Sequence, residues 1–529
     1  MKLQQFLDHY NLAENPFAHE DAKDDDIFRR HLIDGTHHPA WDKIFGPPDH
    51  PSTSVVFGEQ GSGKTALRLQ MVDQIRRHNA GTADNKVLVV EYDDLDPFLD
   101  TLRENIGRAG KTPEKTVKSV KLHDHMDAIL SLATSRLLDI VNGNVDDSEK
   151  VSAERIKALT PLQRRDTMVL AALYDRSYDQ SPRRRWRAIR KRVGYSTWKT
   201  WWDVLLGVVV TLLALLGLGY YLFGDSVDAG SVNVVRPVGG EAVVETADKE
   251  TADASEPTYT WLPFAIAGGI ALLGWLPYLW HRMRLFFKAR KIAKRIRVLD
   301  KRPSDLRRIL AKFSRDELLN QPLPTGDSAD PRYELFHKLS GVLRALGFKA
   351  MLVIIDRVDE PHLVNGQAER IRDVLWPLLD HKFLSTDDVA FKMLLPKDVT
   401  DFLDRESADF HQRSRLDKRN LVKSLEWSGQ SLYDITNDRL RACTRDGEEP
   451  ITIDQIFDAS LTTDVLIDRF ARLRLPRHLF KFLYRLLVDH CSKFTEQEPD
   501  YTISRDTVES QLALFTRDLD AYSRGRGAG

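Results

Sequence analysis

The sequence predicts an α/β fold: a parallel β-sheet covered by helices, two long apolar helices inserted into it, and a helical region at the C-terminal end. Three observations predict this fold. Short apolar runs alternate with helical stretches, a glycine-rich turn separates the first run from a helix, and two uncharged apolar segments lie between the second and third runs. Alternating strands and helices are typical of βαβ units, whose strands run parallel. A chain of 529 residues is long enough for two or three domains.

Five apolar runs are the expected strands. Runs of this length that lack polar alternation are typical of strands buried on both faces. Helical periodicity separates them, for example in HMDAILSLATSRLLDIV and LQRRDTMVLAALY, and continues from residue 428 onward as a predicted helical lid. The predicted strands are residues 55–57, 87–92, 352–355, 389–395 and 421–427.

Two apolar segments predict a hairpin that crosses a membrane. Residues 204–223 (VLLGVVVTLLALLGLGYYLF) and 261–280 (WLPFAIAGGIALLGWLPYLW) carry no charge, and each has the roughly 20 residues that a membrane-spanning helix needs. The alternative is a pair of buried core helices, but such helices are rarely so long and free of charge. Small residues of the second segment, such as Ala265 and Gly269, have the spacing of a helix–helix contact, although this spacing is also ordinary membrane-helix composition.

The charges around the hairpin predict its orientation. The sequence before the first segment and the sequence after the second are strongly basic, whereas the connecting residues 224–260 are mostly acidic. Cationic flanks stay on the cytoplasmic side, so both ends of the chain are expected in the cytoplasm and the protein in the cell (inner) membrane. The basic flanks can in addition bind anionic lipid head groups.

This organisation divides the chain into four parts. The first and third form the sheet domain, the first with a helical insertion; the second is the hairpin with its basic flanks and acidic loop; the fourth is the helical lid. The four parts are residues 1–182, 183–302, 303–427 and 428–529.

Residues 58–65, here called the glycine-rich loop, read GEQGSGKT and match the phosphate-binding motif G-x-x-x-x-G-K-[ST] in full. Its glycines permit backbone geometry that side chains would block, and its amides, with the positive end of the following helix, attract phosphate oxygens. We expect Lys64 to reach the terminal phosphates and the Thr65 hydroxyl to bind Mg²⁺. The predicted nucleotide-binding residues are Gly58, Glu59, Gln60, Gly61, Ser62, Gly63, Lys64, Thr65 and Ala66.

An acid at the end of the third strand is the second part of the predicted site. Residues 351–360 read MLVIIDRVDE, which places Asp356 at the carboxyl end of a buried strand, where it can hold Mg²⁺ through water. Asp359 or Glu360 is expected to orient or deprotonate the attacking water; the sequence favours Glu360 slightly and does not separate the two. A surface acid cluster that closes a strand is the alternative. No N-K-x-D motif for reading guanine occurs, which favours ATP.

With these motifs in the order GEQGSGKT, hairpin, IIDRVDE, the chain resembles the AAA+/STAND branch of P-loop ATPases. It most resembles the KAP family, whose members insert membrane helices between the phosphate-binding loop and the metal-binding acid. The chain departs from that family in detail, since Arg357 follows Asp356 where a second acid is usual and Glu360 closes the motif in place of a basic residue. The resemblance implies an AAA+-like core.

The same resemblance implies further candidate residues. Arg477, in RLPRHLFKFL, corresponds to a sensor arginine that touches the γ-phosphate, and Lys397 or Asp398 occupies the place of a polar sensor. One of three arginines before the fifth strand could act on a neighbouring subunit, although solvated surface arginines are the simpler interpretation. These three are Arg413, Arg415 and Arg419. The chain is therefore expected to form a homo-oligomer or to bind a protein partner. Residues 15–17, Asn-Pro-Phe, resemble an N-terminal element that packs near the nucleotide base.

Composition sets limits on other functions. The net charge is −1, so the charge balance indicates no nucleic-acid partner. The two cysteines, Cys443 and Cys491, form no CxxC pair, which argues against a zinc site or a disulfide framework. The polar start of the sequence predicts no secretory signal.

The expected function is that of a membrane-anchored ATPase. ATP with Mg²⁺ would drive a conformational or assembly switch at the cytoplasmic face of the membrane, and the resemblance associates such switches with signalling or phage defence. The alternative is a nucleotide-dependent membrane scaffold with little or no turnover.

Overall fold

The structure is a computed structural model that describes the chain except for residues 20, 34, 108–111, 177–180, 224–260 and 524–529. The predicted acidic loop, residues 224–260, thus lies outside the described residues. The chain forms two compact units. The first comprises Met1–Gly194, Lys294–Asp300 and Gly326–Gly529, and the second comprises Tyr195–Ala293 and Lys301–Thr325.

The first unit contains a five-stranded sheet in the order β2-β3-β4-β1-β5, and every pair of neighbours is parallel. This confirms the predicted α/β class and the position of all five strands. The fifth strand is shorter than predicted, because the chain leaves the sheet after three residues. The strands are β1 (Ser54–Gly58), β2 (Lys86–Tyr92), β3 (Phe348–Ile355), β4 (Val389–Pro396) and β5 (Asn420–Val422).

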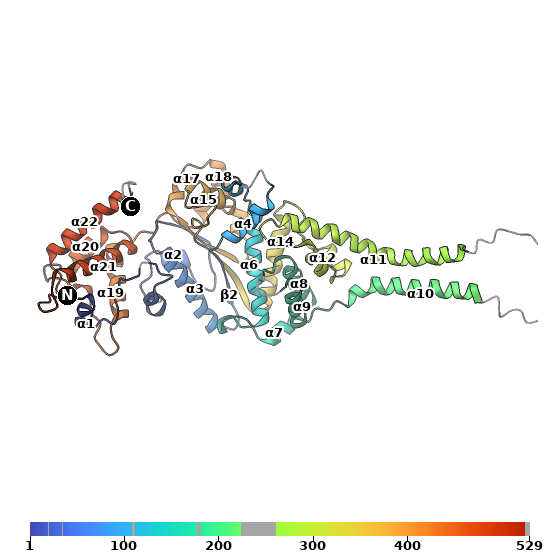
Figure 1. The fold of residues 1–529 in the computed structure, drawn as a ribbon, viewed down its shortest axis with the longest axis horizontal. Helices are drawn as coiled ribbons and strands as arrows, with labels where there is room; N and C mark the ends of the chain where they lie inside the picture. Colours follow the sequence, from blue (N-terminus) through green and yellow to red (C-terminus); the bar gives the residue numbers. More distant parts are fainter. Residues whose placement is uncertain (20, 34, 108–111, 177–180, 224–260, 524–529) are drawn as a thin grey trace, which may run out of the picture. The chain divides into compact units, whose positions relative to one another are not determined.

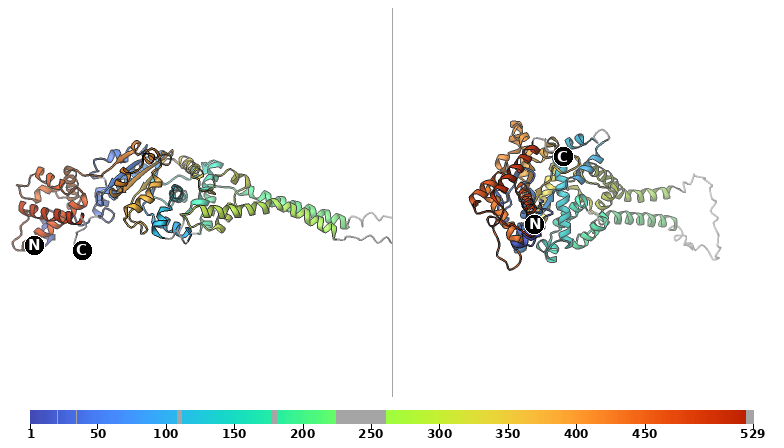
Figure 2. Two further views of the ribbon diagram at one scale, coloured as in Figure 1. Left: turned by 90° about the horizontal axis from the view of Figure 1, so that it is seen from above. Right: turned by 60° about the vertical axis from the view of Figure 1, so that its left-hand side comes forward.

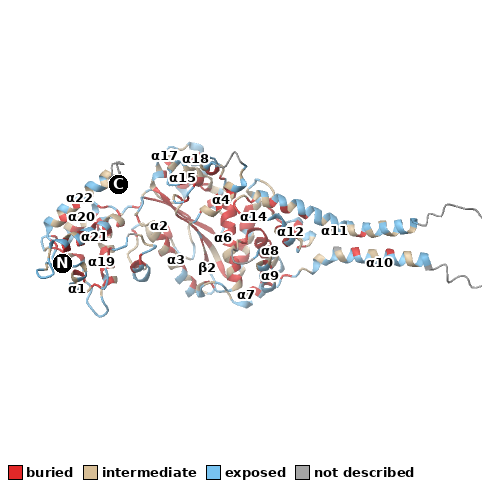
Figure 3. Ribbon diagram, viewed as in Figure 1, coloured by how far each residue is buried: buried red, intermediate tan, exposed pale blue. Residues whose placement is uncertain are grey.

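Helices cover the sheet on both faces (Figure 1). On one face, α2 (Trp41–Phe45) and α3 (Lys64–Gly81) share a hydrophobic core with alternate strand residues such as Val87 and Leu352. On the other face, α6 (Leu122–Asn142) meets the opposite set, since Tyr92 of β2 contacts His125. Every residue of β1 and β4 is buried, which agrees with strands covered on both faces (Figure 3).

Strands β2 and β3 are paired, although a long helical region lies between them in the sequence. Its helices in the first unit are α4 (Asp96–Asn105), α5 (Pro113–Lys118), α6, α7 (Ala153–Ala158), α8 (Pro161–Tyr174), α9 (Pro182–Val193) and α14 (Asp330–Ala345). Short helices connect the later strands: α15 (Ala368–Leu375), α16 (His381–Leu384), α17 (Thr400–Asp404) and α18 (Ala408–Ser414).

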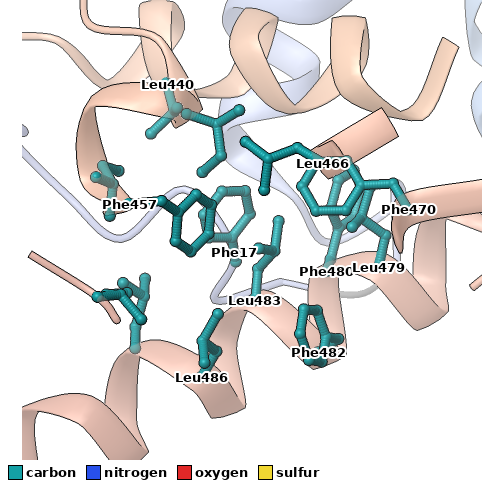
Figure 4. Packing of buried hydrophobic residues seen from close by; sticks show 14 of the residues in the cluster. Phe17, Leu440, Phe457, Leu466, Phe470, Leu479, Phe480, Phe482, Leu483 and Leu486 are labelled. Atoms are coloured by element: carbon teal, nitrogen blue, oxygen red, sulfur yellow. The ribbon is translucent and has the colours of Figure 1, made fainter. Parts of the chain in front are cut away.

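The C-terminal region is helical, as expected, and has its own hydrophobic core (Figure 4). The N-terminal residues belong to this core too: Phe6 of α1 (Leu3–His9), Phe17 and Phe28 are buried among its leucines and phenylalanines. The predicted boundaries, which assigned residues 1–182 to the sheet domain, did not foresee this. The C-terminal helices are α19 (Gly429–Cys443), α20 (Thr463–Ala471), α21 (Pro476–Lys493) and α22 (Arg505–Ser523).

The second unit contains the two apolar helices α10 (Trp202–Phe223) and α11 (Leu262–Arg295), with α12 (Pro303–Leu310) and α13 (Arg315–Leu319). Both apolar helices are long and apolar enough to cross a membrane, and they lie side by side (Figure 2). Only 11% and 6% of the most apolar 18-residue stretch of each helix is buried, whereas a core helix would be mostly buried.

Close packing joins α10 and α11 near the middle of α10. The Trp275 indole donates a hydrogen bond to the Thr211 hydroxyl at 3.0 Å, and a Cβ on Gly274 would lie 2.7 Å from Val210. By contrast, a Cβ on Gly269 would meet no atom within 4 Å. Gly269, one of the predicted small-residue positions, is therefore not part of this close contact.

Candidate functional site

The glycine-rich loop leaves β1 and enters α3 with a backbone that only glycine adopts readily. Gly61 has φ of 85° and Gly63 has φ of 94°. A Cβ on Gly61 would also lie 2.7 Å from the Cβ of Arg477, so a side chain has no room there. Gly63 is the N-cap of α3, whose first amides have no partner within the helix. The loop thus has the geometry of an anion-binding helix N-terminus.

Lys64 folds back onto the loop. Its ammonium donates hydrogen bonds to the carbonyl oxygens of Gly58 at 2.8 Å and Glu59 at 2.9 Å. Burial lowers the pKa of Lys64, while the carboxylates of Asp359 and Asp356 oppose that shift. The ammonium is therefore held by two backbone oxygens and feels the charge of two nearby carboxylates, so an anionic ligand at the loop would find a cation in place.

Asp356 follows β3 directly and its side chain is 2% exposed. One carboxylate oxygen, Oδ1, accepts a hydrogen bond from the Arg357 amide at 2.9 Å. The other, Oδ2, is buried and has no hydrogen-bond partner among the described residues. Burial raises the pKa of Asp356, and the nearby Arg68 guanidinium opposes this most strongly. An orphaned carboxylate oxygen of this kind can bind a cation or an ordered water.

Two further acids follow Asp356 on the same loop and differ in their surroundings. Asp359 is half-buried and supplies the largest opposing charge acting on Lys64. Glu360 is 60% exposed, and its carboxylate lies 3.5 Å from the Arg357 guanidinium. The left-handed backbone of Arg357, with φ of 56°, turns the chain between Asp356 and these acids.

The C-terminal part of the chain contributes two contacts to the loop. The Arg477 amide donates to the carbonyl oxygen of Gly61 at 3.4 Å, and the Trp427 indole donates to that of Ser62 at 2.8 Å. The guanidinium nitrogen Nε of Arg477 is buried and has no hydrogen-bond partner among the described residues. Arg477 thus lies against the loop with this unsatisfied donor, while its guanidinium lies 4.0 Å from the Asp21 carboxylate.

One cavity of about 250 Å³ brings most of the predicted residues together. It is lined by Lys64 and Asp356, which are 292 positions apart in the chain, and by Asp359, Glu360 and Arg477. Of the predicted loop residues, Gln60, Gly61, Gly63, Thr65 and Ala66 also line it. Three others do not: Gly58, Glu59 and Ser62.

The residues outside the cavity have other contacts. The Glu59 carboxylate pairs with the Lys397 ammonium at 2.8 Å, because Gly58 and Pro396 are neighbours in the sheet. Ser62 is buried, and its hydroxyl oxygen lies 2.4 Å from the position that a Cβ on Gly58 would occupy. These residues shape the loop from behind.

The three arginines that could act on a neighbouring subunit do not line this cavity. Arg413 lines a separate cavity with Lys118 and Asp380, and Arg415 is exposed. Arg419 donates to the Ser385 hydroxyl.

The structure adds residues that the motifs did not indicate. The cavity is also lined by the N-terminal segment, through Phe28 and His38, and by Asp438, Arg439 and Phe480 of the C-terminal helices. Trp427 could have been found, since it ends the predicted fifth strand and so belongs at the same sheet edge. The others come from regions without a motif.

No protein-family model, no curated protein and no solved structure matches the chain. The geometry itself is therefore the basis for a function. All strands are parallel, so their carboxyl ends meet at one edge, and the cavity lies there beside β1, where the strand order reverses.

Proposed function

We propose that the chain binds ATP with Mg²⁺ in this cavity and hydrolyses it to drive a conformational or assembly switch at a membrane. One observation carries the proposal: the glycine-rich loop and Asp356, far apart in the sequence, line a single cavity. The loop then acts as a P-loop and α3 as the phosphate-binding helix of a P-loop ATPase core.

The residues fit a nucleotide and its metal ion. Positive-φ glycines and the first amides of α3 suit phosphate oxygens, and Lys64 supplies a cation beside them. The Thr65 hydroxyl and the orphaned oxygen of Asp356 are hard oxygen ligands of the kind that Mg²⁺ prefers. The bound ion would neutralise charge on the terminal phosphates. The part of the cavity lined by Phe28 and Phe480 offers apolar surface for the nucleoside.

Hydrolysis requires an acid that holds the attacking water. In this step the water oxygen bonds to the γ-phosphorus, the bond from that phosphorus to the ADP oxygen breaks, and the proton of the water leaves to an acceptor. Asp359 or Glu360 serves as that acceptor or orients the water. Arg477 supplies positive charge to the γ-phosphate, which is the role expected for a sensor arginine.

Anchoring in the membrane is supported by α10 and α11, which expose large apolar side chains on most of their surface. Such surface is unfavourable in water and is satisfied by lipid. We further propose that nucleotide changes how the C-terminal helices close on the loop, and thereby whether subunits or partners assemble. Arg413 or Arg415 would then act on the neighbour. The alternative, a scaffold in which binding suffices, shares the site but lacks turnover.

The Lys64→Ala variant tests the site. It is expected to abolish ATP binding in calorimetry of the detergent-solubilised protein, while the protein still fractionates with membranes. The control is Lys382→Ala, because Lys382 is 67% exposed and pairs with Asp330 rather than with the loop. Normal ATP binding by Lys64→Ala would show that the site is misassigned. Binding without turnover in the wild type would favour the scaffold.

A further inference from the structure

Arg68 is a buried cation next to the proposed site that no motif indicates. It lies on α3 one helical turn after Lys64, and its side chain is 5% exposed. It does not line the cavity. Arginine is almost never buried unless it is paired, so its partners identify its task.

The partners of Arg68 are the acids at the ends of two neighbouring strands. Its Nη1 pairs with Asp93, which follows β2, and lies 3.6 Å from Glu91. Its Nε lies 3.6 Å from Oδ2 of Asp356, which follows β3. Tyr92 and Ile355 are register partners, so Asp93 and Asp356 follow neighbouring strand ends, and Arg68 on α3 contacts both carboxylates.

The contact with Asp356 has an unusual geometry. Neither Nε of Arg68 nor Oδ2 of Asp356 has a hydrogen-bond partner among the described residues, and 3.6 Å is too long for a direct bond. Arg68 therefore compensates the charge of the buried carboxylate without occupying the lone pairs of Oδ2. A buried carboxylate without such a cation would be strongly disfavoured.

We propose that Arg68 is a positioning residue: braced by Asp93, it holds the Asp356 carboxylate in place with Oδ2 free for the metal ion of the bound nucleotide. This inference rests on the proposed function and deepens it. Arg68 would contact neither the phosphates nor the metal ion. Replacing it should therefore change only the part of the nucleotide affinity that depends on Mg²⁺.

The experiment measures the affinity of the solubilised full-length protein for a non-hydrolysable ATP analogue, once with EDTA and once with MgCl₂. The Arg68→Gln variant is expected to keep its affinity in EDTA, where the loop and Lys64 suffice. The gain in affinity that Mg²⁺ produces should fall by about 10- to 100-fold, the usual effect of removing a residue that orients a metal ligand. Arg68→Lys should restore part of the gain.

Asp93→Asn provides an independent variant, since it removes the brace and leaves Arg68 in place. It should lower the Mg²⁺-dependent gain in the same direction, and the double variant should lose less than the two single losses combined. Arg77→Gln is the matched control on α3, because Arg77 is 53% exposed and pairs with Asp73.

The outcomes separate this inference from the proposed function. A wild type that binds no analogue in either buffer ends both. A wild type that binds with a Mg²⁺ gain, together with variants that keep this gain, overturns the role of Arg68 alone. Equal losses in EDTA and MgCl₂, with a lowered unfolding temperature, would show a purely structural ion pair and overturn it as well.

Discussion

The two acids that follow Asp356 present different chemistry to the cavity. Asp359 is half-buried and acts directly on Lys64, whereas Glu360 is mostly exposed and lies beside Arg357. An acid that holds water next to the terminal phosphate needs a fixed position near the loop. Under the proposed function we therefore expect Asp359 to hold the water, whereas the sequence slightly favours Glu360.

We predict that Asp359→Asn lowers the ATP turnover rate by about 10²- to 10⁴-fold, the usual contribution of a positioned acid or base. Glu360→Gln should lower it far less, because its side chain is already turned toward Arg357. Steady-state phosphate release under saturating ATP measures both rates, and calorimetry shows whether binding is retained. The opposite ranking would assign the role to Glu360.

Lys392 is a buried cation in the middle of β4, with no exposed surface. Its ammonium donates to the carbonyl oxygens of Ile44 at 2.6 Å and Phe45 at 2.9 Å, and so holds the end of α2 on the sheet. Burial lowers its pKa from 10.5 to about 7. Below pH 7 Lys392 carries its proton in both the folded and the unfolded state. The cost of burying its charge therefore lowers the folding stability in full.

Between pH 7 and 10.5 the unfolded chain binds a proton that the folded chain has released, so folding stability must rise with pH there. We predict that the stability of the wild type relative to Lys392→Met increases over this range, by at most about 1.4 kcal/mol per pH unit. Thermal unfolding of both proteins in detergent at several pH values measures it. A difference that stays constant with pH would mean that Lys392 keeps its proton in the folded state.

At the level of single residues, motif spacing located the loop and Asp356 because their chemistry depends on local geometry. Gly61, Gly63 and Lys64 belong to one turn, and their tasks follow from that turn alone. Arg68 has no such local signal, because its importance depends on which strands are neighbours, and Trp427 could be inferred only from its place at the end of the predicted fifth strand. That neighbourhood is a property of the sheet order and is not encoded in any short segment.

At the level of elements, the strands were predictable because parallel strands buried on both faces are continuous apolar runs. The lid helices were predictable from their periodicity. The N-terminal segment was not, since α1 has only seven residues and the segment up to Phe28 is largely irregular. Its apolar residues are sparse in sequence, and they form part of a core only beside α19 and α21.

A buried ion pair joins this N-terminal segment to the C-terminal helices. Arg439 of α19 donates to Asp25 and, at 2.6 Å, to the carbonyl oxygen of Pro16. Its guanidinium also lies 4.4 Å from the centre of the Phe480 ring. The side chains of Asp25 and Arg439 are 2% and 5% exposed, so the ion pair is largely removed from bulk solvent.

We predict that Asp25→Ala destabilises the folded state by about 3–5 kcal/mol, because it leaves Arg439 buried without its carboxylate. The matched control is Asp26→Ala: Asp26 pairs with Arg30 on the surface, where both side chains are about two-thirds exposed, and a loss of about 0–1 kcal/mol is expected. Denaturant unfolding compares the two variants, and hydrogen exchange in α19 localises the effect. If the Asp25→Ala and Asp26→Ala variants were equally stable, the buried ion pair would not stabilise the packing of the N-terminal segment.

At the scale of the whole molecule, the residues that follow α11 are held against the helix that covers the end of β2. Arg297 donates to the Asp124 carboxylate at 3.0 Å and to the carbonyl oxygen of Ser119 at 2.9 Å. Asp124 lies at the start of α6 and is followed by the fully buried His125. The chain leaving the apolar helix is thus anchored to α6.

His125 connects α6 to the sheet. Its Nε2 lies 2.8 Å from the carbonyl oxygen of Val374, so Nε2 is the donor and Nδ1 accepts from the Tyr92 hydroxyl at 3.0 Å. Tyr92 is the last residue of β2 and precedes Asp93, the partner of Arg68. Polar contacts, linked at two points by adjacent residues of the chain, therefore connect Arg297 to Asp93 and Arg68.

Contiguity alone does not establish coupling, so the expectation must be tested as an energy. We predict that Arg297→Gln changes the Mg²⁺-dependent affinity for the ATP analogue by about 2- to 30-fold, which corresponds to the roughly 0.5–2 kcal/mol found for residues along such networks. Combined with Asp93→Asn, the effects should be non-additive, because both changes act on the same contacts. Arg290→Gln, a change at an exposed residue on α11 itself, controls for the loss of a positive charge in this part of the chain. Unaltered affinity in Arg297→Gln, or strict additivity with Asp93→Asn, would mean that the contact of Arg297 with α6 does not influence the nucleotide site.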